Sequence, residues 1–353
     1  MSRGTFVQRR PSGTGPAQPL GGTFAALDLG TNNCRLLVAH PAAAGFRVVD
    51  SFSRIVRLGE GLVATGRLGA AAMDRAIEAL VACRARLARR PGCAVRAVAT
   101  EACRRADNGP AFLQRVQAET GLRFDIIAPR EEAELALESC SPLLDRSNRR
   151  ALLFDIGGGS TELAWIRLDG PAAPELIGYV SLPLGVVTMA ERHAEFAFTP
   201  AGYEAMVEEA LAALIPFETT HRIGGELRAG GVQAIGTSGT VTTLAGVALD
   251  LPRYRRPLVD GTTLSAAQAA AALHRLGRLG EEGLRQHPCI GPDRADFVLP
   301  GCAIFDAIRT LWSFPRVTVA DRGLREGILL RLMREARHPT RRAAPRPSMA
   351  LPA

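Results

Sequence analysis

The feature that most constrains the fold is a short pattern that occurs twice. An apolar stretch ends at Asp28-Leu29-Gly30, and the same arrangement returns 127 residues later at Asp155-Ile156-Gly157. Each copy runs through a tight turn into a second apolar stretch that ends near Leu36 and Leu163, respectively. A repeat of this length indicates a duplicated domain and not a solenoid. The sequence therefore predicts two structurally similar halves.

The length of 353 residues also favours two domains, because a single hydrophobic core rarely grows beyond about 250–300 residues. We expect a disordered tail at 1–22, a first domain at 23–140, a second domain at 141–338 and a disordered basic tail at 339–353. The final helix, 324–337, is a candidate to pack back on the first domain. Both tails are rich in proline, glycine and alanine, which favours disorder.

Apolar periodicity predicts strands that alternate with helices, which indicates an α/β fold class. The expected strands are 24–29, 36–39, 46–58, 94–99, 124–127, 151–156, 162–168, 176–182, 232–235 and 317–319. The expected helices are 70–89, 110–120, 131–140, 200–214, 238–249, 265–279, 293–311 and 324–337.

Composition excludes several classes of protein. No apolar run reaches the roughly 20 residues that span a bilayer, so no membrane association is expected. The N-terminus has no apolar segment of the kind found in signal peptides, and a cytoplasmic location is expected. The 7 cysteines are scattered and contain no C-x-x-C pair, which argues against both disulfides and a zinc knuckle.

The charge argues against a nucleic-acid partner, although the net charge is +8. Much of the excess comes from arginines in the two tails, and the rest of the chain is nearly balanced. All 43 basic residues are arginine, since the sequence contains no lysine. This excludes a Walker A lysine, a protein-kinase lysine and Schiff-base chemistry.

The two turns are the first candidate sites. An aspartate that leaves a buried strand beside free backbone N–H groups can hold a cation on its carboxylate and a phosphate on the amides. Asp28 and Asp155 are therefore the metal candidates. The phosphate-binding candidates are Gly30, Thr31, Asn32, Asn33, Gly157, Gly158, Gly159 and Ser160. Two ordinary hairpins with turn-forming residues are the alternative.

Three further segments carry polar groups at strand ends. Gly239 and Thr240 lie where a strand passes into a helix and are candidates to bind phosphate, with simple helix capping by Thr237 or Ser238 as the alternative. Glu132 belongs to an acidic first helical turn, where acids commonly serve only the helix dipole. Arg104 has the forked guanidinium that suits phosphate oxygens, although a surface arginine is a weak signal.

Together these segments resemble the exopolyphosphatase/guanosine pentaphosphate phosphatase (Ppx/GppA) family. The resemblance covers about residues 23–335 and depends on the motifs that begin at Asp28, Ala99, Glu131, Asp155, Gly236 and Asp321. It implies two actin-like (ribonuclease H-like) domains with the active site in the cleft between them. The chain ends too early for a C-terminal phosphohydrolase extension and contains no His-Asp dipeptide, so it resembles the short, two-domain form.

The resemblance also implies roles for individual residues. Glu132 corresponds to the general base, Asp155 to the carboxylate that holds magnesium or the attacking water, and Arg104 to a phosphate-binding arginine. It implies Mg²⁺ as cofactor, with Mn²⁺ as a second candidate, and a homodimer. Two departures concern the same region: Ala128-Pro129 replaces the usual Ser-Gly, and Glu134 stands where an arginine is usual.

The expected function is release of terminal orthophosphate from inorganic polyphosphate, and hydrolysis of guanosine pentaphosphate (pppGpp) is the alternative within the family. An actin-fold small-molecule kinase and a sensor that binds polyphosphate or nucleotide without turnover are the alternatives of other classes. The sequence does not separate polyphosphate from pppGpp.

Overall fold

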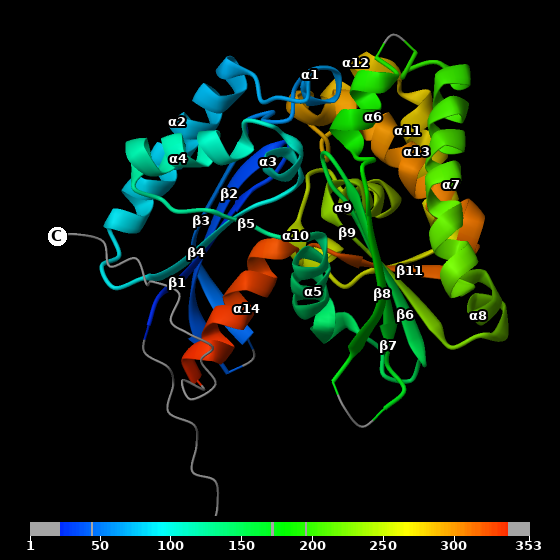
Figure 1. Ribbon diagram of the computed structural model, residues 1–353. Coiled ribbons are helices and arrows are strands. Elements are labelled where there is room, and N and C mark those ends of the chain that lie inside the picture. Colours follow the sequence, from blue (N-terminus) through cyan, green and yellow to red (C-terminus); the bar gives the residue numbers. More distant parts are fainter. Residues whose placement is uncertain (1–21, 44, 171–172, 195, 338–353) are drawn as a thin grey trace, which may run out of the picture.

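The computed structural model describes residues 22–43, 45–170, 173–194 and 196–337, which form two twisted sheets flanked by helices (Figure 1). The expected tails lie outside the described residues, except for Gly22. The strands are β1 (Phe24–Leu29), β2 (Asn33–Ala42), β3 (Gly45–Ile55), β4 (Ala94–Ala99), β5 (Asp125–Ile126), β6 (Arg150–Ile156), β7 (Thr161–Arg167), β8 (Glu175–Leu182), β9 (Val232–Thr237), β10 (Thr263–Ser265) and β11 (Arg316–Ala320).

The helices connect and cover these strands. They are α1 (Leu62–Thr65), α2 (Ala70–Ala88), α3 (Glu101–Arg105), α4 (Gly109–Thr120), α5 (Pro129–Cys140), α6 (Val186–Arg192), α7 (Pro200–His221), α8 (Ile223–Ala229), α9 (Ser238–Ala248), α10 (Arg256–Val259), α11 (Ala266–Arg278), α12 (Gly280–Gln286), α13 (Ala295–Trp312) and α14 (Leu324–Arg337). Two short 3₁₀ turns lie at Ser141–Leu143 and Pro292–Arg294.

The two sheets share one topology. The first has the order β3-β2-β1-β4-β5, and the second has β8-β7-β6-β9-β11 with an additional edge strand, β10. In each sheet the first three strands are antiparallel and the next two run parallel to the first strand. We call each sheet, with the helices that pack on it, a lobe.

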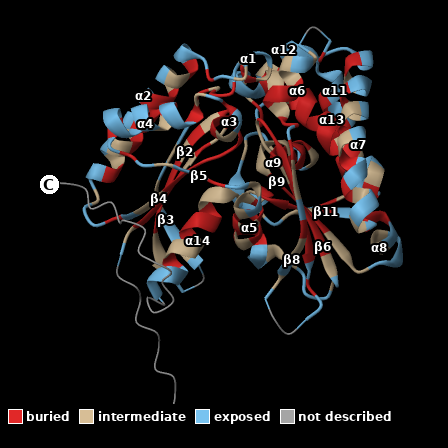
Figure 2. Ribbon diagram, viewed as in Figure 1, coloured by how far each residue is buried: buried red, intermediate tan, exposed pale blue. Residues whose placement is uncertain are grey.

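Burial on both faces explains why the first strand of each lobe is an almost continuous apolar run. In β1, Leu27 and Leu29 face the core under α2 and α4, whereas Phe24 and Ala26 face the core under α14. Strand β6 is buried on both faces in the same way. Figure 2 shows this buried layer along both sheets, with exposed residues on the outer helix faces.

Helices α5 and α14 lie side by side between the two sheets (Figure 1). Leu135 of α5 packs with Ile328 and Leu329 of α14 against the first sheet, while Ala133 and Leu137 of α5 pack against the second. The end of the first domain at residue 140 stays a prediction, because α5 contacts both sheets. We propose that α14 belongs to the first lobe, since it covers one face of that sheet.

The bounds of most helices and strands were predicted to within a few residues, and the differences have physical reasons. The helix expected to end at Leu214 continues through Pro216 to His221, because burial of Phe217 outweighs the hydrogen bond that proline removes. The strand expected over 46–58 ends at Ile55, because the next residues hydrogen-bond to another loop. Short helices such as α6 were not expected, since tertiary contacts and not propensity stabilise them.

Candidate active site

The two repeated turns have the same backbone geometry. The amide of Gly30 donates to the carbonyl oxygen of Asn33 at 2.9 Å, and the amide of Gly157 donates to that of Ser160 at 2.9 Å. Each turn therefore closes between the end of the first strand of its lobe and the start of the second. The matching sequences produce matching turns.

The turns contact each other across the boundary between the lobes. A Cβ atom on Gly158 would lie 3.2 Å from Cβ of Asn32, and one on Gly159 would lie 2.5 Å from Oγ1 of Thr31. No larger side chain fits at Gly159 without a shift, so glycine is required there by close approach and not by a special φ angle. Turns from the two halves of the sequence thus meet at one place.

A cleft of about 1330 Å³ lies between the lobes and brings most of the expected residues together. Its lining includes Asp28, Gly30, Thr31, Asn32, Asn33, Glu132, Asp155, Gly157, Gly158, Gly159, Ser160, Gly239 and Thr240. Arg104 is the one expected site residue that does not belong to the lining of this cleft. The proposed metal and base residues therefore share one cleft with the turns.

Three carboxylates, those of Asp155, Glu162 and Glu132, form an acidic group on the second-lobe side of the cleft. Burial raises the pKa of Asp155 to about 6, although a hydrogen bond from Ser238 opposes the shift. Burial and the charge of Asp155 raise the pKa of Glu162 to about 7, and Ser160 and Ser181 hold its Oε1 at 2.6 and 2.7 Å. Crowded acids of this kind are stabilised by a cation or by a proton.

Glu132 lies at the edge of this acidic group, in the first turn of α5. Its pKa is raised well above the ordinary value, mainly by burial and next by the charge of Glu162, while Arg104 opposes the shift. Only 15% of its side-chain surface is exposed. A carboxylate with a raised pKa in a cleft is suited to accept a proton near neutral pH.

Arg104 donates a hydrogen bond to Glu132 but does not itself line the cleft. Its guanidinium donates to Oε2 of Glu132 at 3.2 Å, to Oε2 of Glu101 at 2.6 Å and to the carbonyl oxygen of Ile127 at 2.9 Å. Burial disfavours its charge, but the two carboxylates outweigh burial and raise its pKa. The geometry therefore suits Arg104 to orient Glu132, whereas its role as a direct phosphate ligand stays a prediction.

The first-lobe side of the cleft is basic. Burial raises the pKa of Asp28, but the neighbouring charges of Arg35 and Arg325 oppose the shift. Burial lowers the pKa of Arg325; the charge of Glu326 opposes this shift, and repulsion from Arg35 adds to it. Arg294, which directly precedes α13 of the second lobe, is affected in the same way and lines the same cleft. Buried guanidinium groups that repel one another favour a bound anion.

The start of α9 lies beside Asp155, whose side chain forms a hydrogen bond with Ser238. Ser238 has a left-handed φ of 80°, which is uncommon for a residue other than glycine and is typical of functional sites. Thr237 does not cap the helix with its side chain; its hydroxyl donates to the carbonyl oxygen of Arg322. A Cβ on Gly239 would meet only open space, so its backbone is accessible from the cleft.

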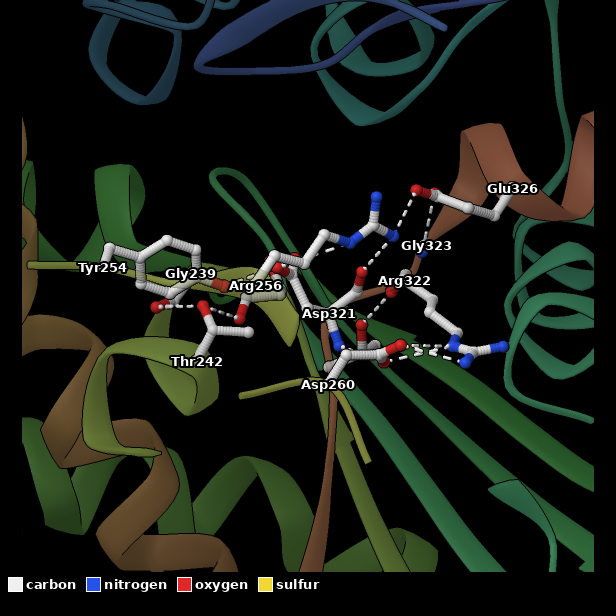
Figure 3. Close-up of polar contacts among 11 residues, drawn as sticks. Gly239, Thr242, Tyr254, Arg256, Asp260, Asp321, Arg322, Gly323 and Glu326 are labelled. Carbon is white, nitrogen blue, oxygen red and sulfur yellow. Dashed lines mark hydrogen bonds and ion pairs between the residues drawn. The ribbon is translucent and has the colours of Figure 1, made fainter. Parts of the chain in front are cut away.

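The chain crosses from the second sheet back to the first lobe through residues 321–326, and a polar network fixes this crossing (Figure 3). Arg256 lies between Asp321 and Glu326, donating to the carbonyl oxygen of Asp321 at 2.6 Å and to Oε1 of Glu326 at 3.0 Å. The other oxygen of Glu326 accepts from the amide of Gly323. Arg325, whose charge acts on Asp28, belongs to this crossing segment.

Several cleft residues were not among the expected site residues: Glu162, Arg35, Ser238, Arg294 and Arg325. Glu162 and Arg35 had a usable signal, since they occupy equivalent positions of the two repeats. Glu134, which stands where an arginine is usual, does not line the cleft, and its carboxylate pairs with Arg130 at 2.9 Å. Pro129 is the first residue of α5, where proline is well tolerated.

The donors fit a hard cation that shares its ligands with a substrate. Within the described residues, no group of three His, Cys, Asp or Glu side chains could hold a metal alone. Mg²⁺, however, commonly takes only one or two carboxylates together with water and phosphate oxygens. Asp28 and Asp155 both face the cleft, and the buried Oδ1 of Asn32 has no hydrogen-bond partner among the described residues.

Known proteins resemble this chain over most of its length. A model of the Ppx/GppA phosphatase family matches residues 37–336. A guanosine-5'-triphosphate,3'-diphosphate pyrophosphatase of Photobacterium profundum is 30% identical over 323 residues, which make up 91% of this chain and 61% of that protein. The chain therefore spans less than two thirds of the length of this relative.

Solved structures agree. The crystal structure of an exopolyphosphatase-like protein superposes with a TM-score of 0.80 at 30% identity and covers 89% of this chain and 98% of its own. The Aquifex aeolicus member of the Ppx/GppA family has a TM-score of 0.70 at 26% identity, with 90% and 99% covered. These likenesses confirm the expected fold class, α/β with two actin-like domains. No helix in the described part of the chain could span a membrane.

Proposed function

The chain belongs to the Ppx/GppA phosphatase family, and from this premise we propose that it releases the terminal orthophosphate of inorganic polyphosphate by metal-assisted hydrolysis. The observation that carries the proposal is the contact between the two turns, with Glu132 facing the same cleft. Two sets of turn amides beside buried carboxylates suit a phosphoanhydride, because amides bind phosphate oxygens and the acids serve a cation and a water molecule.

The residues of the chain have separate tasks in this reaction. The amides of the two turns bind the oxygens of the terminal phosphoryl group, and Arg104 holds Glu132 in place. Glu132 takes the proton of a water molecule whose oxygen attacks the terminal phosphorus. The bond to the bridging oxygen breaks, and the shortened polyphosphate leaves with that oxygen.

A divalent cation is part of the proposal. Asp28 and Asp155 would hold Mg²⁺, or Mn²⁺, together with substrate oxygens. Bound there, the cation would neutralise negative charge on the phosphoryl oxygens. Family membership implies such a cation, and the crowded acids beside Asp155 are consistent with it.

The second candidate is hydrolysis of the 5'-phosphate of pppGpp. It is favoured by the relative from Photobacterium profundum, which is named for action on guanosine-5'-triphosphate,3'-diphosphate. The basic side of the cleft suits either substrate, because both are polyanions.

Phosphate release by the purified protein tests the proposal. Long polyphosphate, tripolyphosphate and pppGpp are compared at equal phosphate concentration with Mg²⁺, with Mn²⁺ and with a chelator. We expect release from polyphosphate that the chelator abolishes, and a Glu132→Gln variant that is slower by roughly 10²- to 10⁴-fold. Glu134→Gln is the matched control, because Glu134 lies in the same helix, two residues after Glu132, but pairs with Arg130 outside the cleft.

Two outcomes would contradict the proposal. Release of phosphate from pppGpp alone would favour the second candidate. Wild-type rates in Glu132→Gln would remove the assigned base.

A homodimer stays a prediction. A cytoplasmic location is also proposed, and it is supported by seven cysteines that are all free and buried, as reducing compartments favour.

A further inference from the structure

Residues 56–61, which follow β3, hold the first turn through backbone hydrogen bonds. The amides of Val56 and Arg57 donate to the carbonyl oxygen of Asn32 at 2.8 and 3.1 Å, and the amide of Gly59 donates to that of Thr31 at 2.9 Å. Thr31 and Asn32 are the residues of the first turn that contact Gly158 and Gly159. We call residues 56–61 the strap. Its position determines the position of the first turn.

The strap also reaches the second lobe. The guanidinium of Arg57 lies 5.5 Å from the ring centroid of Phe297, and its Nη2 lies 3.6 Å from Oδ2 of Asp296; both partners belong to α13. The amide of Gly61 donates to Oε1 of Glu191 in α6 at 2.9 Å. These contacts join the lobes at a place separate from the turns themselves.

The backbone directs the Arg57 side chain toward the second lobe. Arg57 has a left-handed φ of 46°, a conformation that arginine rarely adopts unless its surroundings impose it. Its neighbours Val56 and Leu58 are completely buried in the first lobe. The strained conformation therefore turns Arg57 out of that core, where it contacts α13 and lines the cleft.

We propose that Arg57 is a positioning residue that couples closure of the lobes to the first turn. When α13 holds its guanidinium, the strap fixes Thr31 and Asn32 against the second turn. The inference goes beyond the proposed function but rests on it, because the turns matter for catalysis only if they bind the phosphoryl group. Asp296 keeps a second partner, Arg285 at 3.1 Å, so loss of Arg57 leaves no unpaired acid.

Hydrogen exchange combined with kinetics tests this role. The variant Arg57→Gln removes the charge and the ring contact. Arg86→Gln is the matched control, because Arg86 makes the same pair of contacts inside the first lobe, 5.4 Å from the ring of Phe52 and 2.8 Å from Asp50. Exchange of the backbone amides in 30–33 and 56–61 is measured without substrate, and the KM and kcat for tripolyphosphate are measured separately.

We expect Arg57→Gln to increase both the exchange rate in the two segments and the KM for tripolyphosphate by about three- to tenfold. The reason is that a ring contact and a partly exposed ion pair are lost. The kcat changes less, and Arg86→Gln leaves exchange in both segments unchanged. Phe297→Leu removes the partner on the second lobe and should reproduce the effect, and the double variant should not exceed the larger single effect.

Two results would overturn the inference: unchanged exchange in both Arg57→Gln and Phe297→Leu, or an equal increase in Arg86→Gln. The exchange measurement needs no turnover. If the wild-type protein releases no phosphate from polyphosphate or pppGpp, the proposed function fails while the exchange data still decide whether the strap couples the lobes.

Discussion

The first and second turns have the same backbone but opposite electrostatic surroundings. In the first hairpin Asp28 pairs in register with Arg35, and in the second hairpin the equivalent Asp155 pairs with Glu162. Each turn is closed by the same 2.9 Å hydrogen bond. The duplicated hairpin has therefore kept its geometry while one position of the second strand differs in charge.

This difference divides the cleft. At Asp28 on the first-lobe side, the charges of Arg35 and Arg325 act more strongly than that of Glu326, which favours an anion. On the second-lobe side, Asp155, Glu162 and Glu132 crowd together, which favours a cation or a proton. A repeated backbone can hold phosphate twice, but only different side chains can hold a polyanion at one end and activate water at the other.

Among the variants that compare the two turns, the largest expected effect comes from a glycine that packs against each turn. A Cβ on Gly185 would lie 2.5 Å from the backbone carbonyl of Gly158, and a Cβ on Gly59 would lie 2.3 Å from the methyl group of Thr31. We expect Gly185→Ala to lower kcat/KM about 100-fold and Gly59→Ala about tenfold, because displaced backbone misplaces the turn more than a displaced methyl group does.

The outer helix α11 offers a control for this pair of variants. A Cβ on Gly277 would meet no atom within 4 Å, and alanine favours a helix over glycine. Gly277→Ala should keep full activity and unfold at a slightly higher temperature. Equal kcat/KM values for Gly59→Ala and Gly185→Ala would mean that the two turns tolerate displacement equally.

An intermediate effect is expected at Arg35, whose charge distinguishes the first hairpin from the second. Arg35→Gln removes one cation from the basic side and should raise the KM for tripolyphosphate about tenfold, with little change in kcat, because a charge-assisted contact to a polyanion is lost. The dependence of KM on salt should also become weaker. A lower kcat at unchanged KM would place Arg35 in the chemical step instead.

The smallest expected effect concerns stability on the acidic side. The pKa of Glu132 is raised in the folded state, so folding favours its protonated form. The free energy of unfolding therefore falls as pH rises from the ordinary glutamate range through that raised pKa. Glu132→Gln should therefore raise the Tm at pH 8 by a few degrees relative to wild type, and the difference should shrink as pH falls toward 4.

Calorimetry in chelator would measure this difference without a bound cation. A variant that unfolds at a lower temperature than wild type at pH 8 would contradict the raised pKa. It would mean that the contact with Arg104 contributes more stability than burial of the charge removes.

Much of the fold and part of the site could be predicted from the sequence. Strands such as β1 and β6 were predicted from apolar runs, and the turns after them from glycine and aspartate. The lining of the cleft contains every expected residue except Arg104, which lies behind Glu132. Arg104 could not be placed in advance, because its partner Glu132 is on another helix 28 residues away.

The two equivalent Asp-Gly turns follow from local sequence, because each turn closes through a hydrogen bond between residues three positions apart. Which groups meet depends instead on how the lobes pack: Thr31 with Gly159, Glu132 with Glu162, and Arg57 with Phe297. No local pattern encodes those contacts, since the packing of two separately built sheets is set by the burial of many apolar side chains at once.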